Sequence, residues 1–363
     1  MSPLLLREFH QSIGACFSEL NGAEIVADYG DWQAEYQALR ETACVLDFSF
    51  RGRICLLGND RLRFLHGQIT NDVKRLGPGE GCYAAITTAK GKMESDLNVF
   101  NLPEELLLDF EPGLTEKISE RLAKFIVADD VQIADAAPHY GLLTVQGPKA
   151  MEVAGATGLA ANELSGNRTI IKISDATLGE IYLANQPRLL SGGFDVFVPN
   201  QSLGAVADKL VAAAKNLGGR MCGWTAFETV RIESGIPRFG ADMDANNLPM
   251  ECGIEASAMS FNKGCYIGQE VLNRVHTIGH VTKELRGLRL SDDLKTLPRR
   301  GDKLFRDGKE IGYLTSAVNS PALNATLALG YVRREASQIG AKLTVRTAEG
   351  ESSAQIVELP FIG

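Results

Sequence analysis

The sequence predicts an α+β protein that ends in a separate, small all-β domain. Amphipathic helices and short strands are segregated along the chain and do not alternate as regular βαβ units would. Residues 235–262 are rich in Gly, Pro, Asn and Asp, which is typical of a long functional loop. Almost everything beyond about Lys283 reads as strands and turns, with Asp307-Gly308 as a hairpin turn between two short apolar runs.

The first 130 residues predict helices and strands in mixed order. Asp31 is a suitable N-cap for an amphipathic helix over 31–47. A strand over Arg53–Leu57 follows, and then a helix that Asn59 or Asp60 caps. The region 81–110 is β-rich around a Gly91-Lys92 turn, and an amphipathic helix starts at about Thr115.

From Gly141 onward the sequence consists of short apolar runs separated by turn-forming residues. These runs predict strands over Leu142–Val145, Ile170–Ile173, Ile181–Leu183 and Phe194–Val198. Two helices are expected after them, over 203–216 and roughly 223–234.

Composition excludes several classes of function. The net charge is −8 and the charges are interleaved, so direct nucleic-acid binding is not expected. The apolar run near the N-terminus is too short for a signal peptide, and no 18-residue apolar stretch occurs, so we expect a cytoplasmic protein without a membrane span. The chain has no GxGxxG or GxxxxGK[ST] phosphate loop, which argues against a nucleotide-binding protein.

The seven cysteines are an odd number without a CxxC pair. This pattern predicts reduced thiols in a reducing compartment, and neither a disulfide framework nor a zinc site. His276 and His280 would share the face of a helix, but they lack a third ligand, so no metal site is expected.

Four segments and the C-terminal end resemble a known family. The most specific segment is Lys263–Glu270, KGCYIGQE. The others are Gly58–Val73 with its FLHGQITNDV run, Thr87–Leu97, Val230–Asp242 and Leu359–Ile362. On these residues the chain is similar to the YgfZ-type folate-binding proteins, whose K-G-C-[FY]-x-G-Q-E motif Lys263–Glu270 matches. It is similar in part to the glycine-cleavage T-proteins of the same aminomethyltransferase-like superfamily.

This resemblance implies a three-domain, cloverleaf-like fold with a C-terminal β-barrel and a tetrahydrofolate site in a central channel. The first α+β domain would comprise 1–47 and 140–245. The second α+β domain would comprise 48–139 and 246–282 and carry the KGCYIGQE motif, and the barrel would comprise 283–363.

The resemblance also supplies candidate folate-binding residues. Arg231 matches the arginine that contacts folate in T-proteins, although it could instead pair with Glu228 along its own helix. Asp195 is a partial substitute for a glutamate that grips the pterin in T-proteins. Three aromatic residues are candidates for the folate channel, with ordinary core packing as the alternative: Tyr83, Tyr266 and Phe239.

The residues at positions 95 and 96 indicate which reaction the chain could catalyse. T-proteins carry two adjacent aspartates where this chain has Ser95-Asp96. Asp96 is kept, whereas Ser95 falls where the catalytic aspartate would align. We therefore expect folate binding, and we expect strict T-protein activity to be weak.

Cys265 is the strongest candidate for a chemically reactive residue. Lys263 and a helix predicted to begin near Gly268 would both lower the pKa of a thiol at this position. The alternative is a buried, inert cysteine. Glu270 lies in the first turn of that helix, where capping is as good an explanation as catalysis.

Three functions follow from these residues. The resemblance implies a tetrahydrofolate-binding protein that supports the synthesis or repair of iron–sulfur enzymes, including tRNA-modifying ones, with iron–sulfur client or assembly proteins as partners. The first alternative is an aminomethyltransferase that passes a one-carbon unit to tetrahydrofolate. The second is a folate-binding scaffold without catalysis.

Overall fold

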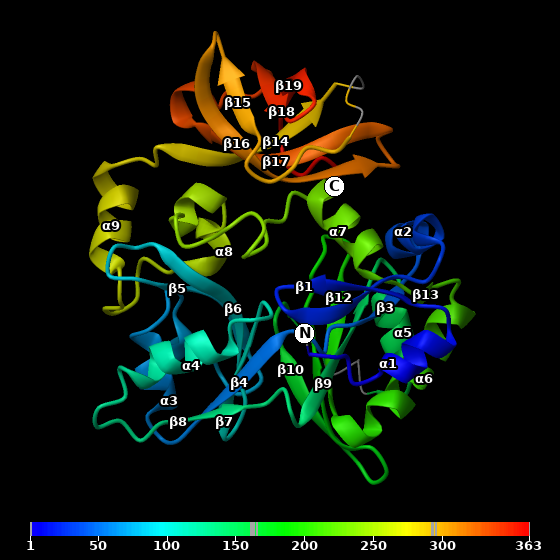
Figure 1. Cartoon of the computed structure of the whole chain (residues 1–363). Coiled ribbons are helices and arrows are strands. Elements are labelled where there is room, and N and C mark those ends of the chain that lie inside the picture. Colours follow the sequence, from blue (N-terminus) through cyan, green and yellow to red (C-terminus); the bar gives the residue numbers. More distant parts are fainter. Residues whose placement is uncertain (1, 160–163, 165, 292–293, 295, 363) are drawn as a thin grey trace. The chain divides into compact units, whose positions relative to one another are not determined.

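The computed structural model describes residues 2–159, 164, 166–291, 294 and 296–362, which form two compact units. Figure 1 labels the helices and strands along the chain. Unit 1 comprises the chain up to Ala84 and Asp96–Val230, and unit 2 comprises Ala85–Ser95 and the chain from Arg231 onward. The chain passes from one unit to the other within a β-hairpin and within a helix. The three-domain division drawn from the sequence stays a prediction.

Unit 1 contains a six-stranded sheet in the order β10-β11-β12-β9-β3-β13. Only β13 pairs in parallel, with β3. The strands are β3 (Cys44–Asp47), β9 (Tyr140–Gln146), β10 (Ile170–Asp175), β11 (Gly179–Ala184), β12 (Gly193–Pro199) and β13 (Arg220–Met221). Helices α5 (Ala150–Ala156) and α6 (Leu203–Asn216) pack on one face of this sheet.

The second sheet has five strands in the order β5-β6-β7-β4-β8. These are β4 (Gly52–Leu57), β5 (Gly81–Thr87), β6 (Met93–Asn101), β7 (Glu105–Phe110) and β8 (Gln132–Asp135). Helix α3 (Arg61–His66) contacts β7, and α4 (Thr115–Ala123) contacts β4 and β8. The 3-10 helix η1 (Val73–Arg75) follows α3, and the β5–β6 hairpin has its base in unit 1 and its tip in unit 2.

The central strands of the six-stranded sheet are apolar on both faces because both faces are covered. On β9, Leu143 and Val145 join the core under α5 and α6, whereas Leu142 joins a second core with Phe100 and Leu107 of the five-stranded sheet. This alternation has the two-residue period of a strand. Helices α2 (Trp32–Glu41) and α7 (Trp224–Glu233) also contribute to the second core.

The N-terminal segment adds a small antiparallel ribbon to unit 1. It consists of β1 (Cys16–Leu20) and β2 (Ala23–Asp28), preceded by the short helix α1 (Arg7–Ser12). The buried His10 of α1 lies 2.9 Å from an Asp47 carboxylate oxygen at the end of β3.

Unit 2 contains a closed six-stranded barrel, as the sequence and its resemblance predict. Its order is β14-β17-β16-β15-β18-β19, with β14 pairing β19 to close it. The strands are β14 (Lys283–Leu290), β15 (Lys303–Arg306), β16 (Lys309–Ser320), β17 (Ala325–Arg333), β18 (Lys342–Thr347) and β19 (Gly350–Val357). The predicted Asp307-Gly308 turn is confirmed: both residues have positive φ, 52° and 75°, as a two-residue hairpin of this kind requires.

Short helical elements lie between the loops in the rest of unit 2. They are η4 (Pro249–Cys252), α8 (Glu255–Ala258), α9 (Gln269–Ile278) and η5 (Arg334–Ala336), and η3 (Asn200–Ser202) precedes α6 in unit 1. Helix α9 ends at Ile278, so His280 lies beyond it and does not share a helix face with His276.

The predicted α+β class is confirmed, and most predicted elements are found. Helix α6 spans the predicted 203–216, and the Asp31 side chain accepts a hydrogen bond from the Ala34 amide as an N-cap. The helix predicted over 31–47 is too long, because it ends at Glu41 and Cys44–Asp47 form β3. Ala43 and Leu46 fit the helical period and are both buried, but Ala43 precedes β3 and Leu46 lies within it, and β3 pairs with β9 on one side and β13 on the other.

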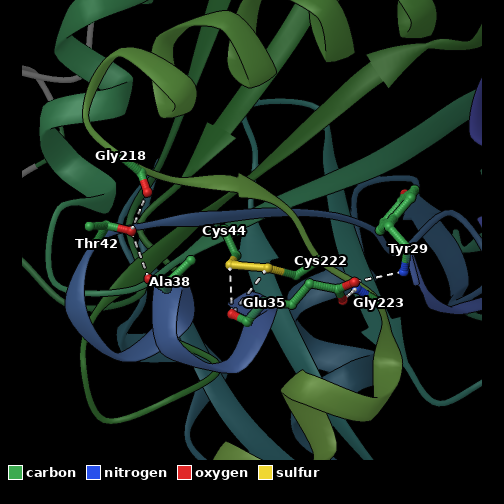
Figure 2. Close-up of a disulfide and its surroundings, with 8 residues drawn as sticks. All are labelled: Tyr29, Glu35, Ala38, Thr42, Cys44, Gly218, Cys222 and Gly223. Carbon is green, nitrogen blue, oxygen red and sulfur yellow. Dashed lines mark hydrogen bonds between the residues drawn. A yellow bond between two sulfur atoms is a disulfide. The ribbon is translucent and has the colours of Figure 1, made fainter. Parts of the chain in front are cut away.

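The expectation that every cysteine is reduced is wrong for one pair: Cys44 and Cys222 form a disulfide (Figure 2). Their Cα atoms are 5.6 Å apart, because β13 pairs with β3 and Cys222 directly follows β13. The two residues are 178 positions apart in the sequence, so no local spacing could indicate the pairing. Beside them, the buried Glu35 carboxylate accepts hydrogen bonds from the Tyr29 and Gly223 amides at 2.6 and 2.7 Å.

No helix in the described part of the chain is both long and apolar enough to cross a membrane.

Candidate functional site

A buried cluster of charged residues lies in the second core of unit 1. Its centre is Asp109 on β7, which is 1% exposed. Arg51 donates from Nε to Asp109 Oδ1 at 2.7 Å and also binds Glu111, so this one guanidinium joins two buried carboxylates. Asn98 on β6 donates to Asp109 Oδ2 at 3.0 Å.

A second arginine enters the same cluster from the loop before β12. Arg188 donates to both carboxylate oxygens of Asp195, at 3.1 and 2.5 Å, and to Asp109 Oδ2 at 3.0 Å. This two-pronged geometry is the strong form of an arginine–carboxylate contact. Asp195, predicted as a pterin contact, is therefore engaged by Arg188 and fully buried, and its folate contact stays a prediction.

Asp96 is the partly exposed carboxylate of the cluster. The Tyr83 hydroxyl donates to Asp96 Oδ2 at 2.8 Å, and both residues are partly exposed. The FLHGQITNDV segment supports this pair, because the Asn71 amide donates to the Tyr83 carbonyl at 2.8 Å and so fixes the start of β5. The Arg168 guanidinium lies 5.6 Å from the centre of the Tyr83 ring.

The protonation of this cluster follows from its charges, with Arg51 and Arg188 facing four carboxylates: Asp96, Asp109, Glu111 and Asp195. Burial alone would raise the pKa of Asp109, but Arg188 and Arg51 more than offset burial and hold that pKa well below its usual range. Burial raises the pKa of Asp195 against the effect of Arg188. Burial and then the Glu111 charge raise the pKa of Asp96 to about 6, against the opposing Tyr83 hydrogen bond and Arg51. Asp96 is thus poised to exchange a proton near neutral pH.

Adjacent residues on a strand point to opposite faces, so only one of Ser95 and Asp96 can join the cluster. Asp96 joins it, and Ser95 is fully buried. A catalytic role for Asp96 stays a prediction.

Sequence reasoning missed Arg51, Arg188 and Asp109. A usable indication was present, since Asp109 interrupts the apolar Leu-Leu-Leu-Asp-Phe run of a strand. A charge inside such a run needs a buried partner. The partners come from distant segments, and no local pattern in the sequence identifies them.

In unit 2 two of the sequence motifs pack against each other. The tip of the β5–β6 hairpin turns at Gly91, and the Thr87 hydroxyl donates to the Ile267 carbonyl of the KGCYIGQE motif at 2.7 Å. Gly268 has φ 91°, and a Cβ placed on it would lie 2.6 Å from the Thr88 carbonyl oxygen. Helix α9 begins at Gln269 directly after Gly268, as predicted, with Glu270 in its first turn.

The predicted catalytic residues Lys263 and Cys265 lie in this motif. The Lys263 ammonium is 4.8 Å from the centre of the Tyr266 ring, and both side chains are buried. Cys265 is exposed, so the alternative of a buried, inert thiol does not hold. Three residues separate Cys265 from the first residue of the helix.

Arg231 and Phe239 have structural contacts of their own in unit 2. Arg231 is 2% exposed and donates to Asp242 Oδ2 at 2.7 Å and to the Ile236 carbonyl, which fixes the 235–242 loop. Asp242 also accepts from the Thr315 and Ser316 hydroxyls of the barrel, both at 2.6 Å. Phe239 is buried and pairs with Met243 in a short bridge. The folate contacts of Arg231, Tyr266 and Phe239 stay predictions.

Two family models match almost the whole chain. The "GCVT N-terminal domain" matches residues 6–263, and the "Glycine cleavage T-protein C-terminal barrel domain" matches residues 283–362. The chain belongs to the glycine cleavage T-protein family. The finer likeness to the YgfZ type stays a prediction.

Named relatives of this T-protein family member span its full length. The aminomethyltransferase of Bacillus subtilis is 27% identical, with 98% of each chain covered. That of Rubrobacter xylanophilus is 29% identical, with 98% of this chain and 93% of the relative covered. The crystal structure of the glycine cleavage system aminomethyltransferase T from Bartonella henselae matches with a TM-score of 0.89 at 22% identity, covering 99% of this chain and 98% of that one, which shows the shared fold.

The contact between the two motifs predicts that Gly268→Ala destabilises this family member strongly. The new Cβ meets the Thr88 carbonyl oxygen and needs a positive φ, so two costs add. Gly253→Ala is the matched control, because Gly253 also has a positive φ, 75°, but nothing lies within 4 Å of its Cβ. The control should lose about 1–2 kcal/mol of unfolding free energy from the backbone alone. Gly268→Ala should lose about 1–3 kcal/mol more. Equal losses in urea denaturation would show that the close packing does not matter.

Thiol reactivity offers a second prediction. Cys265 should alkylate fastest of the five free cysteines in the native protein, because it is exposed, whereas Cys55 and Cys252 are buried. Cys16 is the internal control, since it is also exposed but the nearby Asp28 charge raises the pKa of its thiol. Timed labelling with iodoacetamide and peptide mass spectrometry give the order. Faster labelling of Cys16 than of Cys265 would contradict it.

Proposed function

We propose that the protein is a tetrahydrofolate-dependent one-carbon transferase of the aminomethyltransferase kind, with Asp96 as its catalytic carboxylate. The observation that carries this proposal is the Tyr83–Asp96 pair beside a buried charge cluster, with a pKa of Asp96 of about 6. The full-length relatives named aminomethyltransferase support the same reading. These relatives favour the aminomethyltransferase function over the iron–sulfur function, whereas Ser95 had favoured the iron–sulfur function.

The proposed reaction moves a methylene group from a lipoyl-bound aminomethyl to tetrahydrofolate. The sulfur–carbon bond and the carbon–amine bond break, and the carbon forms bonds to N5 and N10 of the folate. The two protons that these nitrogens lose end on the departing ammonia and on the lipoyl thiol. Atoms and charge therefore balance without an oxidant.

Asp96 suits this reaction as a proton acceptor for a folate N–H and as a donor to the leaving amine. The Tyr83 hydroxyl fixes the orientation of the carboxylate. Arg51 and Arg188 bind Asp109, Glu111 and Asp195 behind it, so Asp96 is the carboxylate of the cluster that neither arginine pairs with directly.

The neighbouring residues fit a polar, aromatic ligand such as the pterin. Among the described residues, Arg168 Nε is buried without a hydrogen-bond acceptor. The Arg168 guanidinium lies 5.6 Å from the centre of the ring of Tyr83, the residue whose hydroxyl donates to Asp96. A ligand atom that accepts a hydrogen bond would satisfy this donor.

The proposal predicts that Asp96→Asn loses turnover but not the fold. Methylene transfer should fall by about 10²–10⁴-fold, because the amide cannot take up a proton. In the wild type the rate should fall as the pH drops below about 6, where Asp96 becomes protonated. Rapid-quench assays of ammonia and methylenetetrahydrofolate give both results.

Stability provides the control for this variant. The pKa of Asp96 is higher in the folded than in the unfolded chain, so the ionised side chain weakens the fold. Asp96→Asn should therefore match the wild type at pH 4 or below and become relatively more stable as the pH rises to about 6, where the gain levels off. Retained turnover in Asp96→Asn would remove Asp96 from the chemistry.

One observation favours a second function, support of iron–sulfur enzymes. Cys265 is exposed within the KGCYIGQE motif, while the buried Lys263 and Tyr266 stack beside it. Core packing explains Tyr266 and gives no reason for an exposed thiol at this position. We propose that Cys265 reacts with or contacts an iron–sulfur client or assembly protein in the cytoplasm.

The two functions make different predictions for Cys265→Ser. This variant should transfer methylene as well as the wild type if Asp96 carries the catalysis. In a strain that lacks its own homologue, it should fail to restore the activity of a cluster-dependent tRNA-modifying enzyme, whereas Cys16→Ser should restore it. Full restoration by Cys265→Ser would reject the second function and leave the first intact.

A further inference from the structure

A cationic cleft lies at one end of the barrel, apart from the residues discussed so far. It has a volume of about 830 Å³, and its lining includes Lys283, Arg333 and Arg334 with His280 and Glu335. Both arginines are exposed, and Lys283 is partly exposed. The whole chain carries a net charge of −8, whereas the lining of this cleft has three permanent cations and one carboxylate.

The barrel register brings two of these cations together. Lys283 opens β14 and lies directly opposite Arg333, the last residue of β17. Like charges at directly opposed positions of an antiparallel pair destabilise the sheet. The arrangement is therefore unfavourable unless an anion lies between the side chains.

Nearby aromatic rings hold Lys283 in place. Its ammonium donates to the Tyr313 hydroxyl at 3.1 Å and lies 4.6 Å from the centre of the Tyr331 ring. Glu310 lines a neighbouring pocket together with Lys283, but it is paired with Lys303 at 2.9 Å. The cleft thus has one fixed ammonium that Glu310 does not neutralise.

The two arginines are available for a ligand. Neither Arg333 nor Arg334 makes an ion pair with any residue in the described ranges. Their side chains start from consecutive positions, and the Arg334 backbone is anchored through its amide to the Thr282 carbonyl at 3.0 Å. Guanidinium groups bind the paired oxygens of phosphates and carboxylates.

We propose that this cleft binds a multivalent oxyanion, with Arg333 and Arg334 gripping its oxygens and Lys283 adding a point charge. The shared chemistry of the ligand is two or more anionic oxygens spaced to meet both arginines. A phosphate ester and a polycarboxylate both supply it. This site is separate from the Asp96 chemistry, so either can fail without the other.

The test is thermal unfolding of the full chain with inorganic pyrophosphate or tricarballylate, against potassium chloride at equal ionic strength. The wild type should show a saturable rise in Tm with at least one of the two anions. If only pyrophosphate binds, the ligand of the cleft is a phosphate ester. If only tricarballylate binds, the ligand is a polycarboxylate.

Three variants make the test specific. Arg333→Gln and Arg334→Gln should weaken the apparent Kd at least tenfold. Arg346→Gln should not, because Arg346 lies on the same barrel but is paired with Glu351 at 2.7 Å. Without anion, Arg333→Gln should unfold at the same temperature as the wild type or higher, since it removes the repulsion with Lys283.

The proposal fails if neither anion raises Tm more than potassium chloride does. It also fails if the anions raise the Tm of Arg333→Gln and Arg334→Gln as much as that of the wild type.

Discussion

The compensation of buried charge around Asp109 is the constraint on which the rest of unit 1 depends. Arg51 and Arg188 reach Asp109 from different segments of the chain, and each also binds a second carboxylate. Removing one partner of such a network leaves an uncompensated buried charge, which costs several kcal/mol. The two sheets must therefore meet in one register for the cluster to form. The same compensation leaves Asp96 as the carboxylate with the least cationic support.

The β5–β6 hairpin connects this cluster to the motifs of unit 2 through the chain itself. Tyr83 and Asp96 lie at its base in unit 1, and the Gly91 turn lies at its tip in unit 2. The tip packs on Gly268, which has the positive φ and the close contact that only glycine accommodates. The FLHGQITNDV segment thus contacts the base of the hairpin through Asn71, and the KGCYIGQE motif contacts its tip.

The sequence predicted elements well where local physics decides them. Helix α6, the Asp31 cap and the Asp307-Gly308 turn depend on periodicity, on one side-chain hydrogen bond and on positive φ, all of which act within a few residues. The helix predicted over 31–47 was too long, because its last residues form β3, and β3 forms through pairing with the distant strands β9 and β13. The Cys44–Cys222 disulfide depends on the same long-range pairing.

The candidate site was predicted in part for the same reason. The motifs indicated Asp96 and Cys265, and Tyr83 was only an aromatic candidate for the folate channel. The role of Asp96 depends on Arg51 and Glu111, which no local pattern connects to it. The most direct test is a carbon-13 NMR titration of the Asp96 carboxyl group. The account predicts a pKa near 6 that rises further in Tyr83→Phe, because the Tyr83 hydrogen bond favours the ionised form. A pKa near that of an ordinary aspartate, unchanged in Tyr83→Phe, would contradict it.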